Sequence, residues 1–250
     1  MRDMGSRDTG SSGGGWTSGP LIGFDTETTG VDVTTDRVVT AALVLRAPGR
    51  PASSRTWLID PGVEIPAEAA AIHGITTAHA RAHGSAPAPA LDEIADEIVA
   101  ALRADTPVVA YNAAFDLSIL DAELRRHALP TLRERLGHEV GPVIDPLVLD
   151  RALVRKRYGK RRLGDLCLHY GVTAGAGGLH SADVDVEATL DVLAAIVADH
   201  PWVSTKDLAE IHRFQVGAHR TWADDFNAWR RRQGFEGAGA STAWPYYDLV

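Results

Sequence analysis

Two carboxylates placed two residues apart at the end of an apolar run constrain this chain more than any other feature. Residues 21–24 have the character of a buried strand, and they lead directly into Asp25 and Glu27. Because residues i and i+2 of a strand point to the same face, both side chains aim at one point. Like charges side by side are unfavourable without a cation between them, and Mg²⁺ prefers carboxylate oxygens. The pair therefore predicts a metal site, although so short a motif also occurs at ordinary strand ends with solvated acids.

Composition limits the class of protein. The chain has 250 residues, of which 45% are hydrophobic, enough for one domain with an appendage. A net charge of −8 argues against a broadly basic nucleic-acid-coating protein, but a local basic groove is compatible with it. A single cysteine excludes an intramolecular disulfide and a cysteine-rich zinc cluster. Because we find no membrane-length apolar run and no signal-peptide pattern, we expect a cytoplasmic protein without a membrane partner.

The order of expected elements favours an α/β fold. Residues 1–19, rich in Gly, Ser, Asp and Arg, are expected to form a disordered tail. Three strands with short links, at residues 20–25, 37–46 and 55–60, indicate an antiparallel meander. Further strands are expected at 106–111 and 143–145, and helices at 67–72, 91–104, 112–128, 146–154, 163–170 and 182–199. Residues 61–90 otherwise have mostly turn composition. This pattern predicts an α/β domain with a mixed sheet over residues 20–200.

A third acid lies at the edge of a helical apolar stripe. In the expected helix at 112–128, Asp116 falls one turn before Leu120. A charge beside the core, just after a buried strand, is unusual unless it is paired or bound to a cation. The alternative is an acid that complements the dipole of the first helical turn.

In the helix expected at 182–199, two neighbouring aspartates lie on different faces. Asp183 shares a face with Glu187, whereas Asp185 falls on the apolar face with Val192 and is predicted to point into the protein. His180 precedes Asp185 in the loop before the helix. A lone loop histidine is usually a surface residue, but one that precedes an inward-facing acid is a candidate general base.

Four acids and one histidine can thus converge, namely Asp25, Glu27, Asp116, Asp185 and His180. This set resembles the DEDDh exonucleases, the DnaQ-like branch of the ribonuclease H-like superfamily, to which the proofreading epsilon subunit of bacterial DNA polymerase III belongs. The resemblance covers about residues 20–200. It rests on Phe24-Asp25-x-Glu27-Thr28-Thr29-Gly30, on Tyr111-Asn112-Ala113-Ala114-Phe115-Asp116 and on His180-x-x-x-x-Asp185, which occur in this order.

The resemblance implies a five-stranded mixed sheet whose second strand is antiparallel, with helices on both faces. It also implies hydrolysis of phosphodiester bonds from the 3′ ends of single-stranded DNA, with release of nucleoside 5′-monophosphates. Two divalent cations, Mg²⁺ or Mn²⁺, would take part. Asp25 would bridge both, Glu27 and Asp185 would hold the cation on the nucleophile side, and Asp116 would support the other. His180 would deprotonate the attacking water.

Residues that contact the substrate are predicted less directly. Thr28 and Thr29 can meet the terminal nucleotide through their backbone and hydroxyl groups. Phe115 can stack on a base, or it can pack in the core. Asn112 can contact substrate, but Asn also favours the N-cap of a helix. The resemblance adds His73 to this set.

The roles of one basic segment and of the C-terminal amphipathic segment remain open between two alternatives each. The run at residues 155–162 can follow backbone phosphates, or it can be a solvated loop, which we favour. Residues 201–250 form a helical C-terminal extension of one or two amphipathic helices. We expect this extension to dock on its own domain, and the alternative is a surface for a DNA polymerase or sliding clamp.

The leading functional hypothesis is a 3′–5′ exonuclease in DNA proofreading or repair. A second hypothesis is the same chemistry on the ends of short RNA or tRNA. A third is a non-catalytic binding subunit of a polymerase assembly, but a scaffold does not need converging carboxylates.

Overall fold

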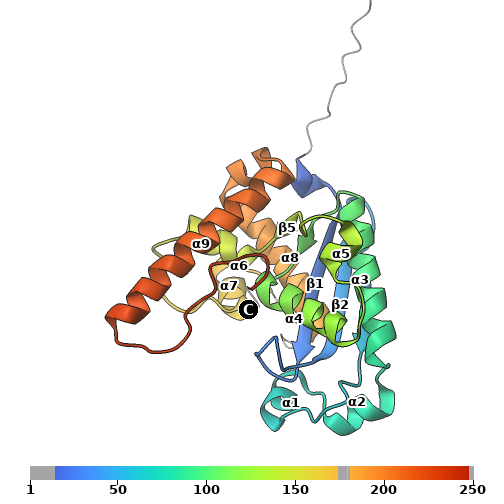
Figure 1. Cartoon of the computed structure of the whole chain (residues 1–250). Helices are drawn as coiled ribbons and strands as arrows, with labels where there is room; N and C mark the ends of the chain where they lie inside the picture. Colours follow the sequence, from blue (N-terminus) through green and yellow to red (C-terminus); the bar gives the residue numbers. More distant parts are fainter. Residues whose placement is uncertain (1–14, 174–178, 180, 248–250) are drawn as a thin grey trace, which may run out of the picture.

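A mixed five-stranded sheet lies at the centre of the protein in the computed structural model, which describes residues 15–173, 179 and 181–247 (Figure 1). The sheet has the order β3-β2-β1-β4-β5. β1 pairs antiparallel with β2, and β2 pairs antiparallel with β3, whereas β4 lies parallel to both β1 and β5. The strand bounds are β1 Leu21–Thr28, β2 Val38–Arg46, β3 Ser53–Leu58, β4 Val108–Val109 and β5 Val143–Ile144.

Helices make up most of the remaining regular structure. The α-helices are α1 Ala67–His73, α2 Thr77–His83, α3 Pro87–Arg103, α4 Ala113–Arg126, α5 Leu132–Leu136, α6 Pro146–Leu153, α7 Leu163–Tyr170, α8 Ala182–Asp199 and α9 Leu208–Arg232. The 3-10 helices are η1 Trp16–Ser18 and η2 Pro201–Thr205. In the described part of the chain, none of the helices combines the length and apolar character needed to cross a bilayer.

The alternation of side chains along β1 divides the core into two layers. Phe24 packs with residues of α3 and α4 on one face of the sheet. The other face is covered by α8, with α6 and α7 beside it. The expected α/β architecture, with a ribonuclease H-like mixed sheet and helices on both faces, is confirmed.

Several expected boundaries are wrong. The strand expected at 106–111 is regular only at Val108–Val109, and Pro107 before it has no amide hydrogen to extend the ladder toward residue 106. Residues 61–90 contain α2 as well as α1, and α2 begins with an unpredicted cap in which the Thr76 side chain accepts from the His79 amide. The short α5 was also not expected.

The expected tail and the C-terminal extension are both partly packed. Trp16 in η1 packs against the α8 side of the core, so ordered structure begins before residue 20, while residues 1–14 lie outside the described part. The C-terminal extension contains the short η2 and one long helix, α9, which packs against α6 and β5, so the expected docking on its own domain is confirmed. After α9 the chain returns to α4, where the Tyr247 amide donates to Ser118 Oγ at 2.9 Å (Figure 1).

Candidate metal centre

A close approach between α8 and β1 assembles the candidate site. Gly23, Asp25 and Glu27 share one face of β1. A methyl group at Gly23 would lie 2.2 Å from Val186 Cγ1 and 3.3 Å from Leu190 Cδ1, so the helix packs directly on the glycine backbone. Because Asp185 precedes Val186 in α8, this packing brings its side chain to the end of β1 where the other two acids emerge.

Three carboxylates meet at this point. Asp25, Glu27 and Asp185 each offer one oxygen atom, and these atoms lie within 4.8 Å of one another. Burial raises the pKa of Asp25 well above its usual range, and the charges of the neighbouring acids raise it further. Burial, with the charge of Asp185, raises the pKa of Glu27 to about 7. An all-oxygen donor set under mutual repulsion fits a hard divalent cation, which would offset that repulsion.

Asp116 approaches the same strand from the opposite helical layer. It lies in the first turn of α4, and its Oδ1 accepts hydrogen bonds from Thr26 Oγ1 at 2.7 Å and from the Thr26 amide at 3.0 Å. Its charge helps to raise the pKa of Asp25, and burial raises its own pKa to about 7. Asp116 is therefore close to the three-carboxylate group but is anchored to β1 by hydrogen bonds.

Asp145 is a buried acid that positions α4 and that our reading of the sequence did not single out. Its carboxylate accepts from the amides of Asn112 at 3.1 Å and Ala113 at 3.0 Å, which fixes the start of the helix that carries Asp116. It also caps α6 by accepting from the Leu147 amide at 2.9 Å. Its position directly before a proline, at the start of a helical pattern, was the available signal.

The threonines that follow Glu27 serve the loop after β1. Thr28 Oγ1 donates to the Gly30 carbonyl at 2.6 Å. The Thr29 hydroxyl donates to Asp36 Oδ1 at 2.7 Å and accepts from the Arg37 amide at 3.0 Å. The half-buried Thr28 remains beside the acids, whereas Thr29 is buried and holds the loop between β1 and β2.

The other expected substrate residues surround the site in different ways. His73 lines a cavity of about 360 Å³ together with Glu27 and Asp183. Phe115 is half-buried and packs against the α3 and α4 side of the core. Asn112 occupies the expected N-cap position of α4, with a positive φ of 61°. Its side chain makes no capping hydrogen bond, so the expectation that this side chain caps the helix is wrong. His180 lies outside the described residues.

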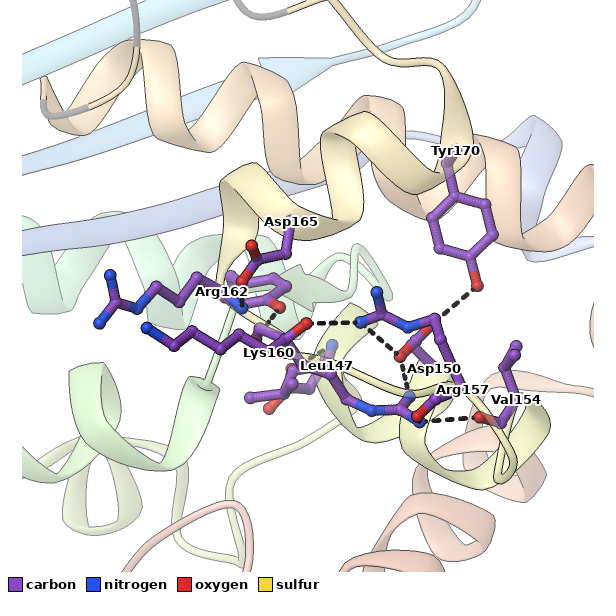
Figure 2. A network of polar contacts seen from close by, with 11 residues as sticks. Leu147, Asp150, Val154, Arg157, Lys160, Arg162, Asp165 and Tyr170 are labelled. Carbon is purple, nitrogen blue, oxygen red and sulfur yellow. Dashed lines mark hydrogen bonds and ion pairs between the residues drawn. The ribbon is translucent and has the colours of Figure 1, made fainter.

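The basic run at residues 155–162 is neither a wholly solvated loop nor a row of free cations. Asp150 of α6 is fully buried and pairs with Arg161 and, at 3.5 Å, with Arg157. Its other oxygen accepts from the Tyr170 hydroxyl at 2.9 Å (Figure 2). The favoured solvated-loop interpretation is therefore wrong for Arg157 and Arg161, while Arg155 is exposed.

Comparison with known proteins agrees with this geometry. A family model described as Exonuclease, of ribonuclease T type, matches residues 22–193. The chain is 31% identical over 176 residues to a PolC-type DNA polymerase III of Streptococcus thermophilus, covering 70% of this chain. It is 30% identical over 189 residues to the PolC-type enzyme of Streptococcus pneumoniae, covering 76% of this chain. The match spans only 11% of the length of each polymerase.

Solved structures resemble the fold at lower identity. Exonuclease I of Methylocaldum szegediense aligns with a TM-score of 0.59 and 24% identity, over 81% of this chain and 43% of that protein. Exonuclease I of E. coli, solved with a dA16 oligonucleotide, aligns with a TM-score of 0.62 and 20% identity, over 81% of this chain and 44% of that protein. These similarities concern the architecture of the domain.

Proposed function

This chain belongs to the DnaQ-like exonuclease family, and from that membership we propose that it hydrolyses single-stranded DNA from the 3′ end in a reaction that needs divalent cations. The observation that carries the proposal is the group formed by Asp25, Glu27 and Asp185, whose oxygens lie within 4.8 Å of one another. Nucleoside 5′-monophosphates are the expected products.

The four acids are the proposed ligands of the cations. We propose two cations, Mg²⁺ or Mn²⁺, with Asp25 shared by both, Glu27 and Asp185 on the nucleophile side and Asp116 supporting the second. When bound, the cations supply positive charge that offsets the charge developing on the phosphodiester group. The hydrogen bonds from Thr26 to Asp116 restrict that side chain, which favours a fixed arrangement over a flexible one.

His180 is the proposed general base. Its sequence position, in the loop that leads into α8 and before Asp185, supports this role. The imidazole must be neutral to accept a proton from water, so activity should rise with pH through the titration of the histidine. Thr28, Thr29, His73, Asn112 and Phe115 are the proposed substrate contacts.

Single-stranded DNA is the favoured substrate, for two reasons. The fold is similar to that of an exonuclease I whose structure was solved with a DNA oligonucleotide. The matched relatives are named DNA polymerases, which favours DNA over RNA. We further propose a role in proofreading or repair, a DNA polymerase or sliding clamp as partner, and a cytoplasmic location. Hydrolysis of RNA ends by the same site is the alternative.

A gel assay tests the proposal directly. A 5′-labelled single-stranded DNA should be shortened to a ladder of 5′-labelled products with Mg²⁺ or Mn²⁺, and the reaction should stop with EDTA or in Asp25→Asn. RNA of the same sequence, run in parallel, tests the alternative substrate. An intact oligonucleotide in the presence of either metal, with retained binding, would instead identify a non-catalytic binding subunit.

A further inference from the structure

A groove between α6 and α9 lies outside the acid site. A cavity of about 870 Å³ is lined by arginines of α6, of the following loop and of α9, together with Phe214 and Trp222. A second cavity of about 310 Å³ shares Arg151 and Trp222 with the first. The two cavities therefore adjoin at Arg151 and Trp222, and we call them together the arginine groove.

The charge of the arginine groove contrasts with that of the whole chain. Four arginines line the larger cavity, and Asp225 is the acid among its lining residues. Arg161 is committed to Asp150, as described above. In the described part of the chain, Arg155 and Arg213 form no ion pair, and both are exposed. A protein with a net charge of −8 thus concentrates available cations in one hollow.

Aromatic rings pack along one wall of the groove. The Arg151 guanidinium stacks on the Trp222 ring, with Cζ 3.5 Å from the ring centroid. Phe226 stacks against Trp222 at 5.4 Å between ring centroids. The stacked pair fixes the position of the Arg151 guanidinium in the wall that both cavities share. Phe214 lines the larger cavity, contacts Trp202 edge-on at 5.5 Å between ring centroids, and is 36% exposed, so part of its ring surface remains for stacking.

The smaller cavity of the groove lies next to the start of α4, the helix that carries Asp116. It is lined by Asn112, which immediately precedes the helical turn that carries Asp116, and by Tyr247. The Tyr247 phenol is close enough to Asp116 for that carboxylate, after burial, to raise its pKa. One end of the arginine groove therefore lies beside the proposed catalytic acids.

We propose that the arginine groove binds the sugar-phosphate backbone of single-stranded nucleic acid and guides its 3′ end to the acid site. This inference rests on the proposed function. Arg155, Arg213 and Arg151 would contact successive phosphates, and Phe214 would stack on a base. Spaced cations with an exposed aromatic ring are the arrangement by which proteins bind single strands without reading their sequence. The groove is formed partly by α9, which lies outside the region matched by the exonuclease family model.

The test measures binding separately from hydrolysis. In the Asp25→Asn full-length background, the affinity for a fluorescent oligothymidylate of about 20 nucleotides is measured by anisotropy over a range of salt concentrations. Each phosphate contact adds about 0.7 to the slope of log affinity against log salt. Arg155→Ala/Arg213→Ala should therefore reduce the slope by about 1.4 and weaken binding about 25-fold at 0.1 M salt.

A matched variant separates local contacts from net charge. Arg50→Ala/Arg81→Ala removes the same number of exposed arginines, from the turn after β2 and from α2, and should leave the slope unchanged. Equal effects of both double variants would overturn the proposal. Phe214→Leu should weaken binding without changing the slope, because stacking releases no counterions.

Hydrolysis of a minimal substrate distinguishes failure of the groove from failure of the proposed function. In the wild-type background, the arginine double variant should hydrolyse a p-nitrophenyl ester of thymidine 5′-monophosphate at the normal rate but show a raised KM for the oligonucleotide. Normal ester hydrolysis with an unchanged oligonucleotide KM would refute the groove alone. No ester hydrolysis by the wild type would refute the proposed function, while the binding slopes would still decide the groove.

The same binding measurement compares ligands. An oligouridylate of equal length distinguishes RNA from DNA as the strand that the groove favours. An acidic peptide that binds when neither oligonucleotide does would assign the groove to a protein partner and overturn the proposal.

Discussion

At Asp150 a buried carboxylate meets two arginines and a tyrosine hydroxyl of its own chain, whereas at Asp25 a carboxylate meets other acids. In the described part of the chain, no lysine or arginine forms an ion pair with Asp25, Glu27 or Asp116. The pKa values of these three acids are raised by burial, and that of Asp25 also by its acidic neighbours. Both sites bury negative charge, and among the described residues arginines pair with Asp150 but not with Asp25, Glu27 or Asp116.

The difference explains how each site is used. An acid paired with arginines stabilises the fold, and here the pairing holds the loop after α6 in place (Figure 2). Acids without a protein cation destabilise one another until a cation arrives from solution. The free energy lost by gathering these acids can then be recovered when a metal binds, which couples the fold to the proposed activity.

The largest expected effect is a loss of activity that occurs on substitution of one aspartate of α8 but not of its neighbour. Asp185→Asn should abolish hydrolysis and weaken metal binding, because it removes a charged oxygen from the three-carboxylate group. Asp183→Asn is the matched control. Asp183 lies outside that group and accepts a hydrogen bond from Ser181, which Asn can also accept. Single-turnover rates and Mn²⁺ titrations of both variants check the prediction, and an active Asp185→Asn enzyme with a dead Asp183→Asn enzyme would contradict it.

The general base should matter less than a metal ligand. His180→Ala should lower the single-turnover rate by ~10²–10⁴-fold, the usual effect of losing such a base. Its affinity for Mn²⁺ and for the oligonucleotide should stay close to that of the wild type, which distinguishes it from Asp185→Asn. A rate and a pH profile identical to those of the wild type would exclude His180 from this role.

The Asp150 site should respond in stability rather than in metal binding. Asp150→Ala leaves two partly buried arginines unpaired and should cost about 3–5 kcal/mol of unfolding free energy. The control is Asp191→Ala, which removes an acid paired with Arg46 at 2.6 Å on the surface and should cost less than about 1 kcal/mol. Denaturant unfolding measures both, and similar losses would show that burial does not set the strength of these pairs.

The sequence predicted local periodicity well and distant contacts poorly. Alternation along β1 and the helical register of α8 place Asp25, Glu27 and Asp185 on the faces that meet in the structure. The partner of Asp150 could not be predicted, because Arg161 reaches it through a loop with no regular period. The role of Asp145 in fixing α4 was also missed, since its acceptor contacts join segments 32 and 33 residues apart.

The length of regular elements was predicted only where the hydrophobic pattern alone determines it. α7 and α8 have the expected bounds, because an apolar periodicity runs through each of them from end to end. β4 is shorter than its apolar run, since pairing with β1 and β5 decides how much of the run becomes a strand. The course of residues 233–247 back to α4 depends on contacts such as that between Trp244 Nε1 and Asp145, which have no local signal.

The smallest expected effect is a pH dependence of stability that distinguishes the acid site from the rest of the protein. The pKa of Glu27 is about 7 in the folded chain, above its ordinary value of 4.5. Between these values the folded protein binds a proton that the unfolded chain has released, so the contribution of Glu27 to stability falls as pH rises. Half-buried His212 acts in the opposite direction, because partial burial lowers its pKa and its contribution is lost as pH falls.

Comparison with Glu27→Gln removes the contribution of the histidines, which both proteins share. In EDTA, the Tm of Glu27→Gln minus that of the wild type should increase by a few degrees between pH 5 and pH 7.5, because only the wild type acquires a repelled charge. With Mn²⁺ the difference should change sign at neutral pH, since the amide cannot replace the carboxylate as a charged ligand. A difference that stays constant with pH in EDTA would mean that the acids of this site tolerate one another without a cation, as Asp150 does only by pairing with arginines.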